Sequence, residues 1–303
     1  MAVMRGRRTD GGEKNMMLVY MNGGLGNQIF QYMFFRWLEI TSGQTCAIDD
    51  GLFFGQHVPH NGYELEHVFG IHPQRLSKSM PSDVWQFMVD RRDQEGLGIA
   101  QQLLDSGMPL SVIRERGVTN IIFHGHTVEY SLGEQLPVGT GDLYFHGYWL
   151  GSVCFSAAEE LLRQELTFPI ISEPQNCQYE EQIKNCHCPV AVHVRRGDMA
   201  SLGWSCRPEF FAAAVRRAVQ DFPVDGLFLF SDDLSWCHEN WDALGLRCGI
   251  PVTEISGNSG SQSFRDLQLM SLCQGRISDR SSFSLLAGIL STVPGRWEIN
   301  NWH

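Results

Sequence analysis

The strongest chemical signal in the sequence is AVHVRRGDM, residues 191–199, where an apolar run ends in two arginines and an aspartate. Side chains alternate along a strand, so we expect His193 and Arg195 on one face. Gly197 lets the chain turn, and Asp198 can orient a guanidinium or accept a proton. Because guanidinium forks match phosphate oxygens, the pattern favours an anion site over its alternative, an Arg–Asp ion pair that only caps the strand.

Three later segments add polar side chains after strands or at helix starts. Asp232 follows the next apolar run and can accept from ribose hydroxyls or base N–H groups, while Asp233 can instead cap the following helix. Asp266 falls in the first turn of a predicted helix, where the helix dipole favours a carboxylate. Ser281 and Ser282 begin another helix, and such a terminus can bind phosphate. Together they predict a nucleotide diphosphate site.

A glycine-rich loop, MNGGLGNQIFQ at residues 21–31, follows the first apolar run. Loops of this kind, placed after a first strand, tend to face a ligand. Asn27 and Gln28 bring amide donors to the start of the following helix, where anions and hydroxyls are favoured. The alternative is a simple strand–helix turn with Asn27 as the N-cap residue.

The same loop only partly fits known phosphate-binding fingerprints. No Gly-Lys-Ser/Thr follows, which excludes a P-loop. The dinucleotide pattern is incomplete, because Ile29 stands where the third glycine belongs. Asp49 and Asp50 do lie where a ribose-binding acid would fall, so an NAD-dependent oxidoreductase stays open as an alternative.

Apolar periodicity predicts two α/β halves joined by a polar, loop-like linker at about 168–188. We expect domains at 16–168 and 186–303. The predicted strands are 16–21, 45–49, 120–123, 142–146, 189–194, 226–231, 251–255 and 275–278. One helix is predicted from the glycine loop to Gly43, and others at parts of 82–106, at 156–166, 208–221 and 261–273, after residue 231, and from residue 282. In the helix at 261–273, Ser263 and Asp266 are spaced as a capping box.

Composition narrows the class of protein. The 303 residues suggest roughly two domains, and a net charge of -11 makes nucleic acid or an anionic membrane an improbable partner. Nine scattered cysteines suggest a reducing compartment, and residues 1–15 have no apolar segment of a signal peptide behind their charges. We therefore expect a cytoplasmic protein, at most peripheral to a membrane and with no membrane insertion. The Cys-His-Cys at 186–188 fits no common zinc spacing, so we predict no metal site.

Six motifs occur in the order found in the α-1,2-fucosyltransferases of glycosyltransferase family 11, which the sequence resembles from residue 16 to about 290. They are GGLGNQIFQY 23–32, GYW 147–149, HVRRGDM 193–199, FSDD 230–233, DLQLMSLC 266–273 and SSFS 281–284. The resemblance implies a GT-B-like α/β fold of two facing Rossmann-like domains with a cleft between them. It also implies GDP-fucose as the donor substrate, a β-galactoside such as lactose as acceptor, inversion of configuration, and no metal or cofactor.

The resemblance also implies roles for particular residues. Arg195 would hold the donor pyrophosphate. The following would assist it or contact the rest of the donor: His193, Ser281, Ser282 and Phe283 at the pyrophosphate end; Asp232 and Asp266 at ribose and guanine; Gly24, Asn27 and Gln28 of the glycine loop across the cleft. Departure of GDP builds negative charge, which an arginine can neutralise, and the chain has no Asp-x-Asp motif for a metal.

Two questions stay open at this level. The general base is Asp198 or the departing phosphate itself. Arg280, Leu285, Leu286 and Leu150 differ from the residues usual in the family, which affects the acceptor rather than the donor. Besides the oxidoreductase, the alternatives are a GT-B transferase with another nucleotide sugar and a carbohydrate-binding protein without activity.

Overall fold

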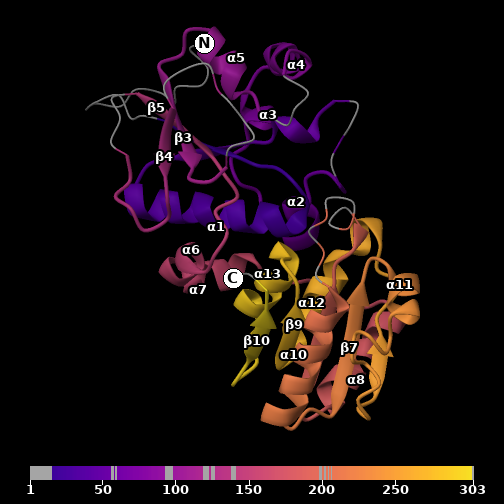
Figure 1. Ribbon diagram of the computed structural model, residues 1–303. Helices are drawn as coiled ribbons and strands as arrows, with labels where there is room; N and C mark the ends of the chain where they lie inside the picture. The colour runs from indigo at the N-terminus through magenta and orange to yellow at the C-terminus, as the bar shows by residue number, and fades with distance from the viewer. Residues whose placement is uncertain are drawn as a thin grey trace. The chain divides into compact units, whose positions relative to one another are not determined.

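The computed structural model describes residues 16–55, 58, 60–92, 98–118, 123, 127–137, 141–197, 200, 203, 205 and 207–301. The chain divides into two compact units, and the boundary lies between Thr167 and Phe168. Each unit has a five-stranded sheet in which every pairing is parallel (Figure 1). The chain is therefore an α/β protein, as the sequence predicts.

The sheet of the first unit has the order β2-β1-β5-β3-β4. Its strands are β1 (Met17–Tyr20), β2 (Cys46–Asp49), β3 (Leu110–Glu115), β4 (Thr127–Tyr130) and β5 (Asp142–His146). The predictions of β1, β2 and β5 are confirmed, whereas β3 and β4 were not predicted. The expected strand at 120–123 lies almost wholly outside the described residues.

The helices of the first unit come mainly between β1 and β3. They are α1 (Leu25–Ser42), η1 (Gly51–Phe53), α2 (Leu65–Phe69), α3 (Leu76–Ser79), α4 (Ser82–Asp90), α5 (Ala100–Asp105), α6 (Val153–Ala157) and α7 (Glu159–Glu165). The longest, α1, ends at Gly43 as predicted, because this residue has a φ of 63° and its amide donates to the carbonyl of Glu39.

The sheet of the second unit has the order β10-β9-β6-β7-β8. Its strands are β6 (Pro189–Val194), β7 (Gly226–Ser231), β8 (Val252–Glu254), β9 (Gly275–Ser278) and β10 (Trp297–Asn300). Its helices are α8 (Pro174–Asn185), α10 (Pro208–Asp221), α11 (Leu234–Glu239), η2 (Gly260–Gln262), α12 (Phe264–Leu272) and α13 (Ser282–Leu290). The sequence predicts all of these strands except β10.

Different helices cover the two faces of the second sheet, and successive side chains of β6 point to one face and then the other. Val192 and Val194 belong to the buried cluster that includes Phe211 and Val215 of α10. His193 points to the opposite face, where it meets α13. The predicted alternation along β6 is therefore confirmed.

Two local predictions are wrong. The predicted linker contains α8, which starts with a proline in its first turn and buries Tyr179 and Ile183 one helical turn apart. The capping box at α12 does not form, because Ser263 makes no side-chain cap bond. The carboxylate of Asp266 instead accepts a hydrogen bond from Asn258.

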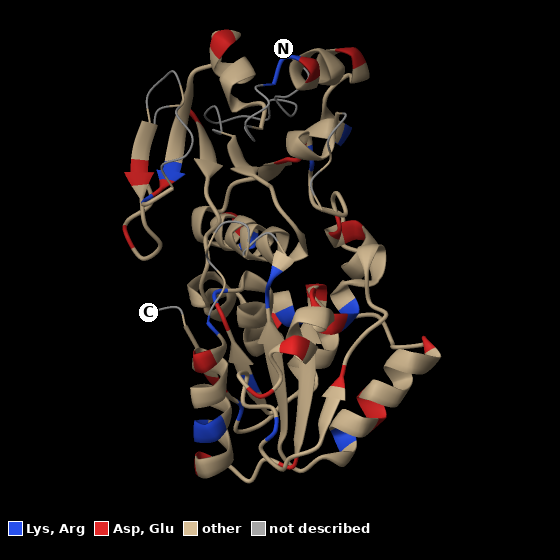
Figure 2. Cartoon of the chain, turned by 45° about the vertical axis from the view of Figure 1, so that its right-hand side comes forward, with Lys and Arg blue, Asp and Glu red and all other residues tan. Residues whose placement is uncertain are grey.

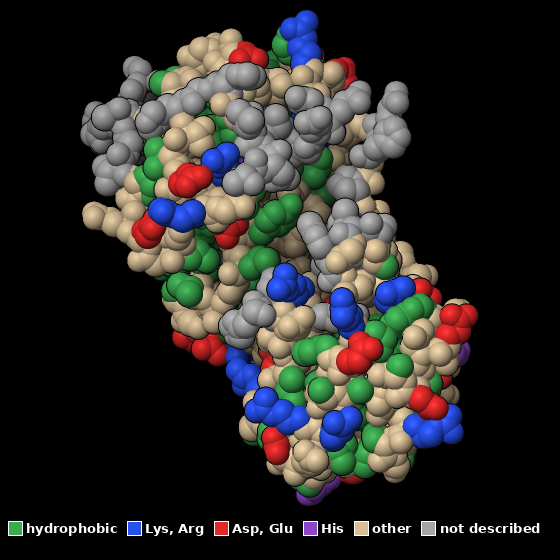
Figure 3. All heavy atoms as spheres, in the orientation of Figure 1, with side chains coloured by type: hydrophobic (Ala, Val, Ile, Leu, Met, Phe, Trp, Pro, Cys, Tyr) green, Lys and Arg blue, Asp and Glu red, His purple; other side chains and the backbone are tan. Residues whose placement is uncertain are grey.

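Within the described part of the chain, no helix combines the length and apolar character that crossing a bilayer requires. On the face of the second unit drawn in Figure 3, basic and acidic side chains are interspersed. With the net charge of -11, this argues against a nucleic-acid-binding surface there.

Candidate functional site

In the second unit, three neighbouring strand ends bring charged residues together. The strand order reverses between β6 and β9, and such switch points of open α/β sheets are where ligands bind. His193 pairs with Ser278 and Val194 pairs with Ser231 in the sheet register. The residues just beyond these strands therefore meet at one edge of the sheet, and Figure 2 shows both basic and acidic residues there.

Arg195 is held at this edge by Asp232. Its Nη1 lies 3.2 Å from Oδ2 of Asp232, while the other oxygen accepts the backbone N–H of Arg196 at 2.7 Å. The side chains of Arg195 and Asp232 are 33% and 29% exposed, so the pair is not sealed in the core. The ion pair orients the guanidinium and leaves part of it accessible to an anion.

The space around this pair depends on a glycine. A Cβ atom at Gly197 would lie 2.6 Å from Oδ2 of Asp232, which is closer than such contacts allow. Gly197 therefore permits the close approach of the loop to Asp232. The next residue, Asp198, our candidate general base, lies outside the described residues.

His193 is built into the second unit, and its predicted part in holding and transferring the donor stays a prediction. It is 7% exposed, and its Nδ1 shares a hydrogen bond with Oγ of Ser284 in α13. Burial, with a further contribution from the charge of Arg195, lowers the pKa of His193 to about 3. The imidazole is neutral at pH 7, so it neither attracts an anion by charge nor acts as an effective base. We assign it the positioning of α13.

The amino end of α13 lies where the sequence predicts it. Ser281 is the N-cap residue and is buried, but its side chain makes no cap bond, and Ser282 begins the helix. Phe283 follows, with its ring centroid 6.3 Å from that of His193. Since α13 follows β9, its first N–H groups face the same edge as Arg195, where they can bind phosphate.

Asp266 is tied to a helix earlier in the chain. Its Oδ1 accepts a hydrogen bond of 2.7 Å from the amide of Asn258, which pairs reciprocally with Asn176 of α8 at 2.9 and 3.0 Å. Burial raises the pKa of Asp266 to about 7, and the Asn258 bond opposes that rise. Because α12 leads into β9, its first turn lies at the carboxyl edge of the sheet, as the prediction for Asp266 requires.

One charged residue of this edge, Asp279, was not predicted from the sequence. Asp279 directly follows β9 and is 2% exposed, and no side chain of the described residues donates a hydrogen bond to its carboxyl group. Burial raises the pKa of Asp279 to about 7. The backbone amide and the positive charge of Arg195 oppose this rise, whereas the negative charge of Asp232 adds to it. The sequence pattern that could have identified Asp279 is the one that identified Asp232, an acidic residue directly after a buried strand.

The glycine loop of the first unit is not arranged as predicted. Gln28 is fully buried, and its amide donates to the carbonyls of Gly23 and Gly62 at 2.9 and 2.8 Å. Its oxygen accepts the backbone N–H of Glu64 at 2.9 Å. Both amide hydrogens are thus used within the unit, so a contact of Gln28 with the donor would need these bonds to break and stays a prediction.

The neighbours of Gln28 also differ from expectation. Gly24 is the N-cap residue of α1, so the alternative that Asn27 caps this helix is wrong. Asn27 lies in the first turn, with its amide close to Gly23. Contacts of Gly24 and Asn27 with a donor remain predictions.

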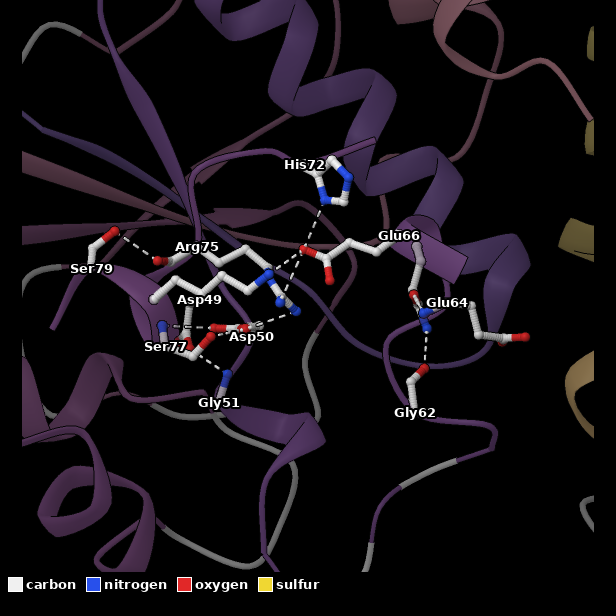
Figure 4. Close-up of polar contacts among 12 residues, drawn as sticks. Asp49, Asp50, Gly51, Gly62, Glu64, Glu66, His72, Arg75, Ser77 and Ser79 are labelled. Atoms are coloured by element: carbon white, nitrogen blue, oxygen red, sulfur yellow. Dashed lines mark hydrogen bonds and ion pairs between the residues drawn. The ribbon is translucent and has the colours of Figure 1, made fainter. Parts of the chain in front are cut away.

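The acidic pair at the end of β2, Asp49 and Asp50, is bonded to groups of its own unit, and Figure 4 shows part of these surroundings. Asp49 is completely buried and Asp50 likewise. Their carboxylates are occupied by groups of the same unit: Tyr144, Gly51 and Ile99 for Asp49, and Ser77 and Arg75 for Asp50. This removes the residue that the nicotinamide alternative needed.

The GYW segment, which carries part of the resemblance, is built into the core of the first unit. The amides of Tyr148 and Trp149 donate to Glu115 at 2.6 and 3.0 Å. Trp149 is fully buried and stacks on Phe34 with a centroid distance of 4.0 Å. No group of three His, Cys, Asp or Glu side chains in the described residues could hold a metal ion, and metal independence stays a prediction.

Solved structures support the fold class. NodZ α-1,6-fucosyltransferase co-crystallised with GDP matches with a TM-score of 0.53 and 16% identity, covering 92% of this chain and 93% of that one. The fucosyltransferase NodZ from Bradyrhizobium matches with a TM-score of 0.52 and 15% identity, covering 91% and 92%. The two all-parallel α/β units thus belong to a GT-B-like fold, as predicted.

Sequence comparison goes further than the fold. Residues 131–297 match Glycosyl transferase family 11, and this is more than half of the chain. The chain is also 24% identical over 276 residues to an α-1,2-colitosyltransferase from Escherichia coli, covering 89% of this chain and 86% of that protein. The protein is a glycosyltransferase and belongs to family 11.

Proposed function

We propose that the protein transfers L-fucose from GDP-fucose to the 2-hydroxyl of a terminal β-galactoside, with inversion and without a metal ion. The observation that carries the proposal is the part-exposed guanidinium of Arg195, oriented by Asp232 at the switch point of the second sheet. A departing GDP places new negative charge on its diphosphate. A fixed guanidinium fork meets that need.

The chemistry assigned to this edge is a single displacement. The acceptor hydroxyl attacks C1 of the sugar from the face opposite GDP, the C1–O bond to the diphosphate breaks, and inversion results. Arg195 and the first N–H groups of α13 stabilise the leaving diphosphate. The hydroxyl proton passes to Asp198 or to the departing phosphate, and both routes remain open.

The names of related proteins support parts of the proposal. The similar structures are fucosyltransferases, one crystallised with GDP, which supports a GDP-linked donor. The Escherichia coli relative is named for an α-1,2 linkage, while NodZ is named for α-1,6. Because that relative transfers colitose by name, a colitose donor is the second candidate.

The test is a coupled assay of GDP release with GDP-fucose and lactose in the presence of EDTA. We expect turnover, with an α-1,2-linked product identified by NMR. GDP-mannose and the GDP-linked colitose donor serve as competing donors under the same conditions. Preference for another donor would replace fucose in the proposal, and acceptor binding without GDP release would indicate a carbohydrate-binding protein.

The base is tested separately with Asp198→Asn. A loss of activity and of the acidic limb of the pH–rate profile is expected if Asp198 removes the proton. Full activity with an unchanged profile would leave the departing phosphate as the acceptor of the proton.

A further inference from the structure

The unexplained group of the site is the carboxyl of Asp279. It is 2% exposed at the end of β9, no side chain of the described residues donates a hydrogen bond to it, and the only hydrogen-bond donors among these residues that favour its ionised form are the backbone amides of Arg195 and of Asp279 itself. A buried ionised carboxylate with so few partners is costly. A protonated carboxyl at the same place avoids most of that cost, so the surroundings of Asp279 favour the acid form.

The charged neighbours of Asp279 come from three elements. Arg195, at the end of β6, opposes protonation, and Asp232, at the end of β7, favours it. Arg195 is already paired with Asp232 at 3.2 Å. The guanidinium of Arg280 in the same loop donates to the carbonyl of Asn301, and His193 on β6 is neutral near pH 7. One paired guanidinium thus faces two carboxyl groups.

A bound diphosphate changes this balance. It would lie against Arg195 and the amino end of α13, which starts three residues after Asp279. Its negative charge adds to that of Asp232 and competes for the same guanidinium. An ionised Asp279 would repel the diphosphate, whereas a protonated one would not and could donate a hydrogen bond.

We propose that Asp279 takes up a proton from solvent when the diphosphate of the donor binds, so that donor binding is linked to the protonation of this residue. The inference rests on the proposed function, because it places the donor diphosphate beside Arg195. No covalent bond changes, and the proton returns to solvent when the diphosphate leaves.

The pH dependence follows from the direction of this link. The pKa of Asp279 is about 7 in the free protein. A ligand that prefers the protonated form binds less tightly as pH rises through that value, so the contribution of Asp279 to affinity falls by roughly tenfold between about pH 6.5 and about pH 8. Below this range Asp279 is already protonated and adds no further change in affinity.

The test is calorimetric titration of the full chain with GDP-fucose, without acceptor, in buffers of different ionisation enthalpy at about pH 8. GDP-fucose is chosen because both of its phosphates are esterified, so the ligand itself does not titrate near pH 7. We expect uptake approaching one proton per bound molecule, and little uptake by Asp279→Asn. At about pH 8 this variant should bind GDP-fucose more tightly than the wild type.

Asp221→Asn is the matched control, because Asp221 is an exposed aspartate at the end of α10. It should take up protons as the wild type does. Wild-type binding without proton uptake overturns the inference alone, whether or not the Asp279 variant folds. Equal uptake by Asp279→Asn and wild type also overturns it. Failure of the wild type to bind GDP-fucose overturns the proposed function and the inference together.

Discussion

Both units have a five-stranded, all-parallel sheet, but they differ in strand order and in the groups at their switch points. In the first unit the ends of β1 and β5 are joined by neutral contacts: Gln31 bonds reciprocally with Asn22 at 2.9 and 2.8 Å and donates to the carbonyl of Gly147 at 3.0 Å. In the second unit the corresponding strand ends carry Arg195 and Asp279.

This difference shows that parallel topology alone does not make a diphosphate site. Both sheets provide an edge with a reversal of strand order. The first unit fills its edge with buried amides whose hydrogen bonds are satisfied internally, as for Gln28 and Gln31. The second leaves Arg195 a third exposed. The residue types immediately after the strands therefore determine which edge presents an exposed charged group.

The largest effect should come from Arg195→Lys. A lysine carries the charge but cannot present a planar fork to the diphosphate, so kcat/KM should fall by roughly 10²- to 10³-fold in the GDP-release assay. Arg217→Lys, on the exposed face of α10, is the control and should keep full activity. Near-normal turnover of the Arg195 variant would show that the charged edge of the second unit does not stabilise the diphosphate, and the contrast between the two units would then have no bearing on function.

A smaller effect, on stability instead of activity, is expected for Gln28→Ala in the first unit. The change leaves two carbonyls and one amide without their buried partner, at a cost of about 3 kcal/mol in the free energy of unfolding. Urea denaturation measures it, with the exposed Gln86→Ala as control. A stable variant with weakened GDP-fucose binding would show that Gln28 contacts the donor after all.

The smallest effect is expected for Asn258→Ala, which sharpens the assignment of Asp266. Without the Asn258 amide the pKa of Asp266 rises further, so the carboxylate that we place against the donor ionises only at higher pH. KM for GDP-fucose should increase about tenfold at neutral pH and recover as pH is raised. Asn240→Ala, at the end of α11, is the control. A uniform loss at all pH values would indicate a merely structural role.

Sequence reasoning predicted the second sheet well because its strands are continuous apolar runs bounded by turn residues. PVAVHV and GLFLFS, for example, correspond to β6 and β7 without error. In contrast, α8 reads as a linker because its sequence is polar, and only Tyr179, Ile183 and Asn176 are buried. A helix with so narrow a buried face has almost no periodic signal.

The site was predicted less completely than the fold, and for a different reason. Residue type shows that Gln28 can bind a ligand, but not that Gly62 and Glu64, more than thirty positions later, occupy its amide. Likewise, the two serines of SSFS account for a phosphate site by themselves, so the local pattern does not single out Asp279. Partners that are distant in sequence determine whether a polar side chain remains available, and local patterns do not contain them.

Gly197 offers a practical route to a folded but inactive protein. The atom that an added methyl group would meet is the end of the Asp232 side chain, not backbone. In Gly197→Ala, we expect the Asp232 side chain to shift away from the added methyl group, so that Arg195 loses its support. Such a variant would be a natural choice for capturing intact donor and acceptor together in a crystal, because turnover is slowed while the scaffold is kept.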